Sequence, residues 1–224
     1  MKVVLFDIDG TLVRTGGAGK TAIESGLSST FGVLELRDTV PYSGRTDLAI
    51  GRDLLAVHDI EPSQENEVRL HESYLARLPE ALRLHGGEVC PGVIELLEWL
   101  APRERILLGL LTGNVRAGAR LKLGHFGLWD YFHCGGFGDF TYDRDDVARA
   151  ALQDVQSHLG AGIDPASIWV IGDTPLDVKC ARAIGAKAVA VATGWHPLGE
   201  LAESKPDVLL ADLTHNTELL QAWA

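Results

Sequence analysis

The sequence is poor in cysteine, in long apolar runs and in positive charge. Its 224 residues include three cysteines, Cys90, Cys134 and Cys180, which lie far apart and form no CxxC pair. Neither a disulfide framework nor a zinc cluster is expected, and buried, reduced thiols are the simplest interpretation. No apolar run approaches the ~20 residues of a membrane span, and the start, MKVVLFDID, turns acidic too early for a signal peptide. We therefore expect a cytoplasmic protein.

The charge balance is acidic. The formal net charge is -11 at pH 7, from 20 Lys and Arg against 31 Asp and Glu. Nucleic acids and anionic membranes would repel such a protein, so neither is an expected partner. An anionic substrate would need a local positive site, which a bound metal cation could provide. The eight histidines show no HxH or HExxH spacing, so a histidine-ligated metal is not expected.

Short apolar runs and amphipathic segments alternate along most of the chain. The apolar runs predict buried strands at residues 3–6, 106–111, 168–171, 188–191 and 208–210. The amphipathic segments predict helices at residues 93–100, 115–123, 145–159 and 176–184. This alternation is typical of an α/β fold, a Rossmann-like parallel sheet with helices on its faces.

One region breaks the alternation. Between residues 15 and 87 the sequence contains only helical patterns, at residues 20–31, 47–57 and 63–78. Glycine-rich stretches at both ends are typical of hinges around an inserted module. We expect a core domain of residues 1–15 and 88–224, and an inserted all-helical cap domain of residues 16–87.

Two acids follow the first predicted strand. Asp7 and Asp9 stand two residues apart in DIDGT, so their side chains project to the same side. Gly10 allows a sharp turn after them. Ligands of open α/β sheets bind at the carboxyl ends of strands. There, one carboxylate could attack phosphorus while the other transfers protons. A turn with two solvated acids is the alternative.

A second strand end carries Thr112, Gly113 and Asn114, just before a predicted helix. The hydroxyl and backbone N–H groups could hold an anion. A simple helix N-cap would use the same residue types.

A third strand end carries Asp173 and Asp177 in GDTPLD, around a predicted helix start. Mg²⁺ takes one or two carboxylates together with phosphate and water ligands, so Asp173 facing Asp7 would suit it. Asp177 could hold a coordinated water. The alternative is that both acids only stabilise the helix N-terminus.

Phosphoryl transfer also needs a cation near the phosphate oxygens. Arg144, in the sequence YDRD before the helix predicted at 145–159, is the candidate. A salt bridge on the protein surface would explain this arginine equally well.

The order DIDGT, LTGN, a basic residue and GDTPLD matches the four motifs of the haloacid dehalogenase superfamily. The chain resembles, over essentially its whole length, the superfamily's phosphohydrolases with a helical C1-type cap, of the phosphoglycolate phosphatase and phosphoglucomutase type. The resemblance implies that Asp7 is a nucleophile that forms an aspartyl-phosphate and also binds Mg²⁺. It implies that Asp9 is the general acid and base and gives the metal its backbone carbonyl.

The resemblance also implies roles for the other two strand ends. Thr112 would hold phosphate oxygens together with the backbone N–H groups of Gly113 and Asn114. Asp173 would bind Mg²⁺ directly, and Asp177 would support the metal site.

The third motif departs from the family, which most often has lysine where Arg144 stands. Arginine stays charged and can bind phosphate with two N–H groups, so the role could survive. Lys122 and Lys179 are the alternatives, although both lie in predicted helices. In the cap, Arg45 lies in YSGRTD, and similar loops in the family reach the active site. Arg45 could bind a second anionic group or a sugar hydroxyl, or it could be solvated.

We expect a Mg²⁺-dependent phosphatase that acts on a small phosphorylated metabolite. Phosphoglycolate is the first candidate by resemblance alone, and a sugar phosphate is another. A sugar-phosphate mutase of the β-phosphoglucomutase type remains open, because it uses the same residues. A metal-independent haloacid dehalogenase is disfavoured by Asp9 and the metal-binding acids, and a catalytically silent binding protein by the complete set of acids.

A nucleotide hydrolase is also disfavoured. The P-loop pattern GxxxxGK[ST], ending here at Lys20 and Thr21, needs a glycine at the position of Arg14. The sequence does not indicate an oligomeric state.

Overall fold

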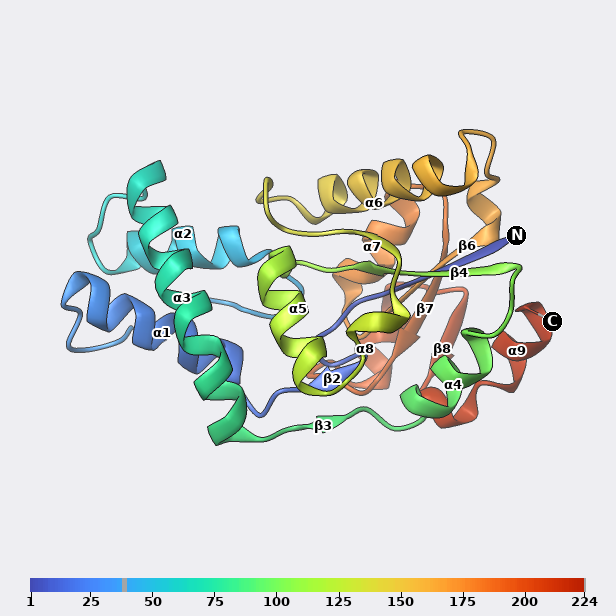
Figure 1. The fold of residues 1–224 in the computed structure, drawn as a ribbon, viewed down its shortest axis with the longest axis horizontal. Helices are drawn as coiled ribbons and strands as arrows, with labels where there is room; N and C mark the ends of the chain where they lie inside the picture. Colours follow the sequence, from blue (N-terminus) through green and yellow to red (C-terminus); the bar gives the residue numbers. More distant parts are fainter. Residues whose placement is uncertain (38–39, 224) are drawn as a thin grey trace.

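The computed structural model describes residues 1–37 and 40–223. Its centre is a six-stranded sheet in the order β5-β4-β1-β6-β7-β8 (Figure 1). All five strand pairs are parallel. The strands are β1 (Lys2–Phe6), β4 (Ile106–Leu111), β5 (Cys134–Gly136), β6 (Ile168–Gly172), β7 (Lys187–Val191) and β8 (Val208–Leu210). Because β1 lies between β4 and β6, the three predicted motif-bearing strands are direct neighbours.

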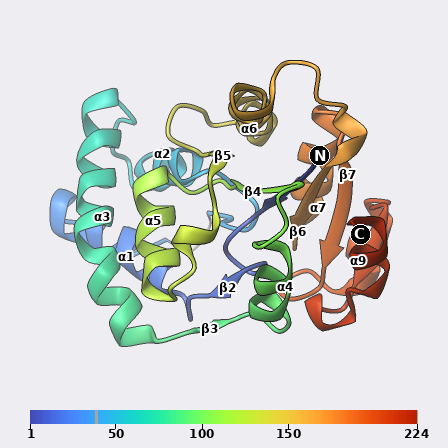
Figure 2. The same ribbon diagram turned by 45° about the vertical axis from the view of Figure 1, so that its right-hand side comes forward.

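Helices cover both faces of the sheet. Alternate residues of β1 enter two hydrophobic clusters, Val4 and Phe6 on one face and Val3 and Leu5 on the other, as the period of a strand requires. The first face carries α4 (Val93–Leu100), α5 (Arg116–His125) and α9 (Thr217–Trp223). The second carries α6 (Arg144–Leu159), α7 (Pro175–Ala183) and α8 (Leu198–Glu203). Figure 2 shows α4 and α6 on opposite sides of the strands. The predicted α/β fold with a parallel sheet is confirmed.

Short 3₁₀ helices complete the core, at η1 (Trp129–Tyr131), η2 (Pro165–Ser167) and η3 (Leu213–His215). Within the described part of the chain, none of the helices has both the length and the apolar character needed to cross a membrane.

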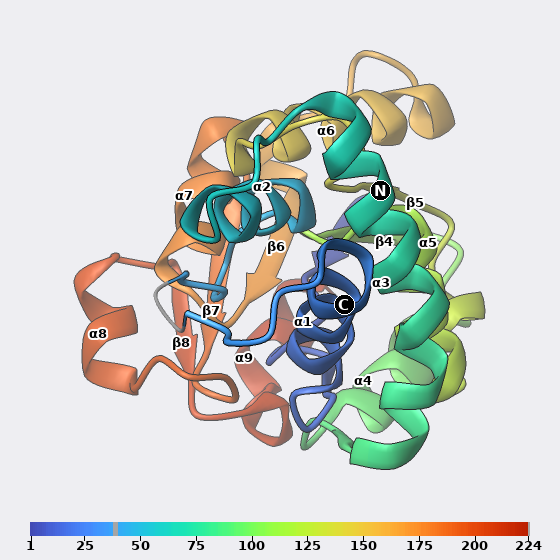
Figure 3. The same ribbon diagram turned by 90° about the vertical axis from the view of Figure 1, so that its left-hand side faces the viewer.

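Three helices lie beyond one end of the sheet and face the viewer in Figure 3. They are α1 (Ala18–Phe31), α2 (Asp47–Val57) and α3 (Gln64–His85). They enclose a hydrophobic cluster, which includes Leu27, Leu54, Leu55, Leu70 and Leu78, and which Val115 joins from the start of α5. The two connections to the core lie side by side, because β2 (Val13–Arg14) pairs antiparallel with β3 (Glu88–Val89). Both termini lie at the opposite end of the molecule (Figure 1).

The predicted end of α3 is wrong. The sequence suggests a helix that stops at Leu78, before Pro79, but the helix continues to His85. Proline within a helix costs about 3 kcal/mol. Leu78 and Leu82, on either side of Pro79, are fully buried, and each contributes about 1.5–3 kcal/mol by burial. The packing of the cluster therefore offsets the cost of the proline.

Candidate active site

Three neighbouring strand ends bring the predicted residues together. Phe6, at the end of β1, pairs with Leu110 of β4 and with Ile171 of β6. The chain then turns at Gly10, which has a φ of 87°. A Cβ atom on Gly10 would overlap the carboxylate of Asp173, so the turn after β1 lies directly against this acid. Only glycine allows both the backbone angle and the close approach.

Asp7 is buried at the centre of this group, with 5% of its surface exposed. Its backbone N–H donates to the carbonyl of Ile171, 2.9 Å away. Arg144 Nη1 lies 3.4 Å from Asp7 Oδ1. Burial raises the pKa of Asp7 to about 7, and the charge of Asp177 adds to the shift while Arg144 opposes it. This carboxyl is held in a water-poor site beside a cation.

The carboxylates of Asp7, Asp173 and Asp177 converge, with one oxygen of each within 4.8 Å of the others. All three side chains are buried. Burial, followed by the charges of Asp177 and Asp7, raises the pKa of Asp173 well above its ordinary value. Buried like charges are costly unless a cation is present, and carboxylate oxygens are the ligands that Mg²⁺ prefers. The donor set therefore fits a hard divalent cation.

Both carboxylate oxygens of Asp177 already have partners. Oδ2 accepts hydrogen bonds from the backbone N–H and the hydroxyl of Thr174, at 3.0 and 2.8 Å. Together with the bond from Asp177 N–H to the Thr174 hydroxyl, this forms a capping box at the start of α7. Oδ1 accepts from Arg144 Nη2. Asp177 is thus placed to orient Arg144 and the helix start, next to Asp7 and Asp173.

The three candidates for the basic residue of the third motif differ in burial and in the acids that they pair with. Arg144 is the first residue of α6, is 6% exposed and pairs with Asp7 and Asp177. It is therefore not a surface salt bridge. The side chain of Lys179 is 60% exposed and pairs with Asp145 at 3.1 Å, away from these contacts.

Lys122, which the sequence raised only as an alternative to Arg144, pairs with Asp9. It lies on α5 and is 4% exposed, and its Nζ lies 2.5 Å from Asp9 Oδ2. The sequence signal for this burial is the position of Lys122 on the same face of α5 as Ala119 and Leu123, which are also buried. A buried lysine on an apolar helix face needs a charged or polar partner, and here that partner is Asp9, whose side chain is 41% exposed.

The second strand end supplies polar groups beside both acids. Thr112 is fully buried, and its hydroxyl lies against Asp7, where it lowers the carboxyl pKa and opposes part of the effect of burial. Asn114 Nδ2 donates to Asp9 Oδ2 at 2.9 Å and to the Thr112 hydroxyl at the same distance. Gly113 lies between Thr112 and Asn114 in the chain, against the loop that precedes α2, where an added Cβ would overlap the carbonyl oxygen of Arg45.

The guanidinium of Arg45, in the loop before α2, contacts residues of that loop and of α2. It pairs with Asp53 at 2.7 Å and donates to the carbonyl of Pro41 at 3.1 Å. Among the described residues, no hydrogen bond or ion pair joins it to Asp7, Asp9, Asp173 or Asp177. Arg45 does line a cavity of about 320 Å³ between the loop before α2 and the first turns of α6 and α7, together with Gly44, Tyr142, Asp143, Arg144, Leu176 and Lys179.

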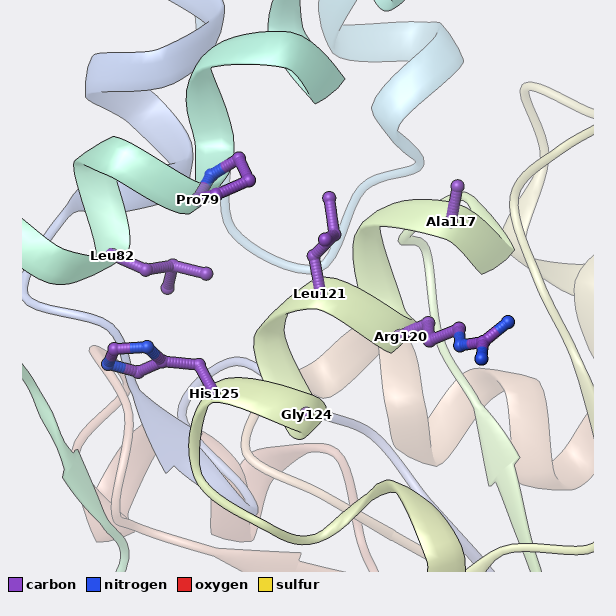
Figure 4. Close-up of a pocket in the computed structure, with 7 residues that line it drawn as sticks. All are labelled: Pro79, Leu82, Ala117, Arg120, Leu121, Gly124 and His125. Atoms are coloured by element: carbon purple, nitrogen blue, oxygen red, sulfur yellow. The ribbon is translucent and has the colours of Figure 1, made fainter.

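A larger cavity, of about 560 Å³, lies between α3 and α5 (Figure 4). Leu121 points from α5 toward Pro79 and Leu82 on α3, while Arg120 points away from α3. No acid lines it. The larger cavity is therefore separate from the group of acids around Asp7.

Comparison with known proteins agrees with the geometry. Residues 4–182 match the family model described as haloacid dehalogenase-like hydrolase. The chain is 31% identical to a Dickeya dadantii protein named probable phosphatase IndB, over 93% of this chain and 88% of the relative. It is 29% identical to a phosphoglycolate phosphatase of Synechococcus elongatus, over 99% of this chain and 97% of the relative.

Among solved structures, CbbY from Rhodobacter sphaeroides, determined in complex with phosphate, superposes with a TM-score of 0.75. It is 20% identical, and the match covers 97% of this chain and 96% of that protein. At this identity the likeness concerns the fold alone. The family match, the relative at 31% identity and the arrangement of the motif residues lead to one conclusion: the chain is an enzyme that belongs to the haloacid dehalogenase-like hydrolases.

Proposed function

We propose that this protein is a Mg²⁺-dependent phosphatase that hydrolyses a small phosphomonoester through an aspartyl-phosphate on Asp7. The observation that carries the proposal is the environment of Asp7. It is buried, it lies beside the guanidinium of Arg144, and it has an oxygen within 4.8 Å of those of Asp173 and Asp177. A nucleophile, a phosphate-binding cation and a metal-binding acid set thus meet at one point, as phosphoryl transfer requires.

The chemistry follows from the two acids after β1. Asp7 attacks the phosphorus atom, and the bond to the ester oxygen breaks as Asp9 gives that oxygen a proton. Asp9 then takes a proton from a water molecule, which attacks the phosphorus and releases inorganic phosphate from Asp7. The carboxylate of Asp7 is restored, and Asp9 is again protonated.

The remaining residues bind and orient the phosphate. Thr112, the backbone N–H groups of Gly113 and Asn114, and Arg144 hold its oxygens. Arg144 Nε is buried and has no hydrogen-bond partner among the described residues, so this arginine retains a donor for a ligand.

The metal would be held by Asp7, Asp173 and the backbone carbonyl of Asp9, with Asp177 in support. When bound, Mg²⁺ supplies positive charge that offsets the negative charge of the phosphoryl oxygens. Asp177 contributes by fixing Arg144 and the first turn of α7 through the bonds described above.

Residues 16–87 act as a cap over a core of residues 1–15 and 88–224. The loop before α2 lies on the core, because Asp47 N–H donates to the carbonyl of Gly113 at 2.8 Å. Such a cap excludes bulk water and limits the substrate to small molecules. Phosphoglycolate is the first candidate, because phosphoglycolate phosphatases are among the relatives that match nearly the whole chain. Arg45 would bind the second anionic group of such a substrate.

The direct test is release of inorganic phosphate from a panel that contains phosphoglycolate, sugar phosphates and p-nitrophenyl phosphate. We expect turnover that needs Mg²⁺ and that EDTA abolishes. Asp7→Asn should lower kcat by at least about 10³-fold, because the nucleophile is lost. Asp146→Asn, at an exposed acid paired with Arg149, is the matched control and should retain activity.

Other outcomes would contradict the proposal. Absence of Mg²⁺-stimulated turnover on every ester would point to a silent binding protein. Activity on haloacids that survives EDTA would point to a dehalogenase. Transfer of phosphate to a second sugar hydroxyl in preference to water would point to a mutase.

A further inference from the structure

A buried lysine lies behind the proposed general acid. Lys122 Nζ lies 2.5 Å from Asp9 Oδ2 and 2.6 Å from Asn114 Oδ1. Asn114 Nδ2 in turn donates to the same Asp9 oxygen at 2.9 Å. The three side chains thus form a closed ring of hydrogen bonds. A buried ammonium is expensive unless it is paired, so this ring accounts for the presence of the lysine.

The ring fixes the direction of the Asp9 carboxylate. Both of its donors, on Lys122 and Asn114, meet Asp9 at Oδ2. Among the described residues, no hydrogen bond holds Oδ1. One oxygen is therefore anchored to the core, and the other is left to face a substrate. A proton donor must be held in such a geometry to act within hydrogen-bond distance of a leaving group.

The cap encloses the same lysine. Gly19 of α1 lies so close that a methyl group in its place would be 3.4 Å from Lys122 Nζ. Asp47, the first residue of α2, accepts from the backbone N–H of Val115 at 2.9 Å, just before α5. Helix α5 has no side-chain cap of its own at Val115. A carboxylate from the cap domain therefore closes the N-terminus of the core helix that carries Lys122.

Lys122 therefore has neighbours from both domains. Asp9 and Asn114 belong to the core, Gly19 belongs to the cap, and Asp47 of the cap holds the start of the helix that carries the lysine. If the cap moved away from the core, Asp47 and Gly19 would leave with it, and the lysine would keep only its core partners.

We propose that Lys122 is a positioning residue that couples docking of the cap, through Asp47, to the orientation of Asp9. This inference rests on the proposed function, because it assumes that Asp9 protonates a leaving group. It assigns Lys122 no contact with the substrate. Its effect should appear only where proton delivery matters, that is, with esters whose leaving group is a poor one.

The test compares two esters in each variant. An alkyl phosphate such as phosphoglycolate needs a proton on its leaving oxygen, and an activated aryl ester, p-nitrophenyl phosphate, does not. In Lys122→Met, kcat/KM for the alkyl ester should fall on the order of 10²-fold, while kcat/KM for the aryl ester changes less than about threefold. A merely structural lysine would lower both values equally.

Asp47→Asn provides a second variant that leaves the ring of Lys122, Asn114 and Asp9 intact. It keeps an acceptor for Val115 N–H but removes the charge, and we expect the same dependence on the leaving group at smaller size. If the two residues act as one unit, the double variant should lose no more than Lys122→Met alone. Arg149→Met, at an exposed basic residue that also pairs with an aspartate, is the matched control and should leave kcat/KM for both esters unchanged.

The outcomes separate the inference from the function. If the unmodified protein hydrolyses neither ester, both proposals fail. If it hydrolyses both, and Lys122→Met and Asp47→Asn lower the two values of kcat/KM by the same factor, the phosphatase stands and the positioning role of Lys122 is overturned. Additive losses in the double variant would overturn the coupling to the cap.

Discussion

At the scale of single residues, Asp7 has the environment that most alters its chemistry. Burial raises its pKa from an ordinary 3.8 to about 7, with the charge of Asp177 adding to the shift and Arg144 opposing it. The folded protein therefore binds a proton at Asp7 more tightly than the unfolded chain does. Without metal, the free energy of unfolding should fall as pH rises from about 4 to about 7, because Asp7 ionises in the unfolded chain first.

Mg²⁺ should reverse this trend. A cation binds the ionised carboxylates only, so the rise in Tm caused by Mg²⁺ should be larger at about pH 8 than at about pH 5. Thermal melts with EDTA or with Mg²⁺ at both pH values measure the difference. Asp173→Asn should abolish most of the Mg²⁺ effect, whereas Asp146→Asn, on the surface, should not. An equal rise in Tm at both pH values would contradict a carboxylate metal site.

Arg45 offers a second prediction at this scale. Its guanidinium pairs with Asp53 of α2, yet it lines the cavity next to Arg144. If it binds the second anion of the substrate, Arg45→Ala should raise KM for phosphoglycolate about 10–100-fold, the value of a hydrogen bond to a charged group. KM for p-nitrophenyl phosphate, which lacks that anion, should stay nearly constant. Equal increases for both esters would contradict the role.

At the scale of helices and strands, the sequence predicted the bounds of an element correctly where its hydrophobic pattern was strong. Strands β4 and β8 and helices α2 and α4 have the predicted bounds. Each has apolar residues at the spacing of a strand or of a helix, so its pattern begins and ends with the element. Strand β5 was missed, since Cys134–Gly136 contains two glycines, and glycine is depleted in strands. The two-residue strands β2 and β3 are too short to have a pattern.

Helix α3 was predicted too short. Local propensity ends it at Pro79, but the buried leucines that flank the proline extend it to His85. The tertiary contacts that decide the outcome come from α1 and α2, which share the cluster around Leu27 and Leu54. Such contacts are invisible to any rule that considers one helix at a time.

At the scale of the whole molecule, topology explains why much of the site could be placed in advance. Parallel strands end at the same edge of a sheet, so the acids after β1 and β6 had to meet the polar residues after β4. Lys122 could not be placed in this way, since it reaches Asp9 from the middle of a helix. The contacts of α1, α2 and α3 with α5 and with the strand ends were equally inaccessible, because they join segments that lie far apart in the sequence.

The contact between the loop before α2 and Gly113 gives a prediction for the molecule as a whole. The loop before α2, which belongs to the proposed cap, lies on Gly113, where a Cβ atom would overlap the carbonyl oxygen of Arg45. Gly113→Ala should therefore push the loop away and break the bond from Asp47 N–H to the Gly113 carbonyl. We expect kcat/KM to fall for alkyl and aryl esters alike, by at least about tenfold. The radius of gyration in small-angle X-ray scattering should increase as the cap opens.

The matched control is Gly124→Ala, on the exposed side of α5, where an added methyl group would meet nothing within 4 Å. Alanine favours the helix over glycine by about 1 kcal/mol, so this variant should melt slightly higher and keep its activity. A methyl at Gly113 would also lie 3.0 Å from Arg144 Nη1, so lost activity alone would not identify the cause. Lost activity with an unchanged radius of gyration would place the damage at Arg144 and contradict the role of Gly113 in docking the cap.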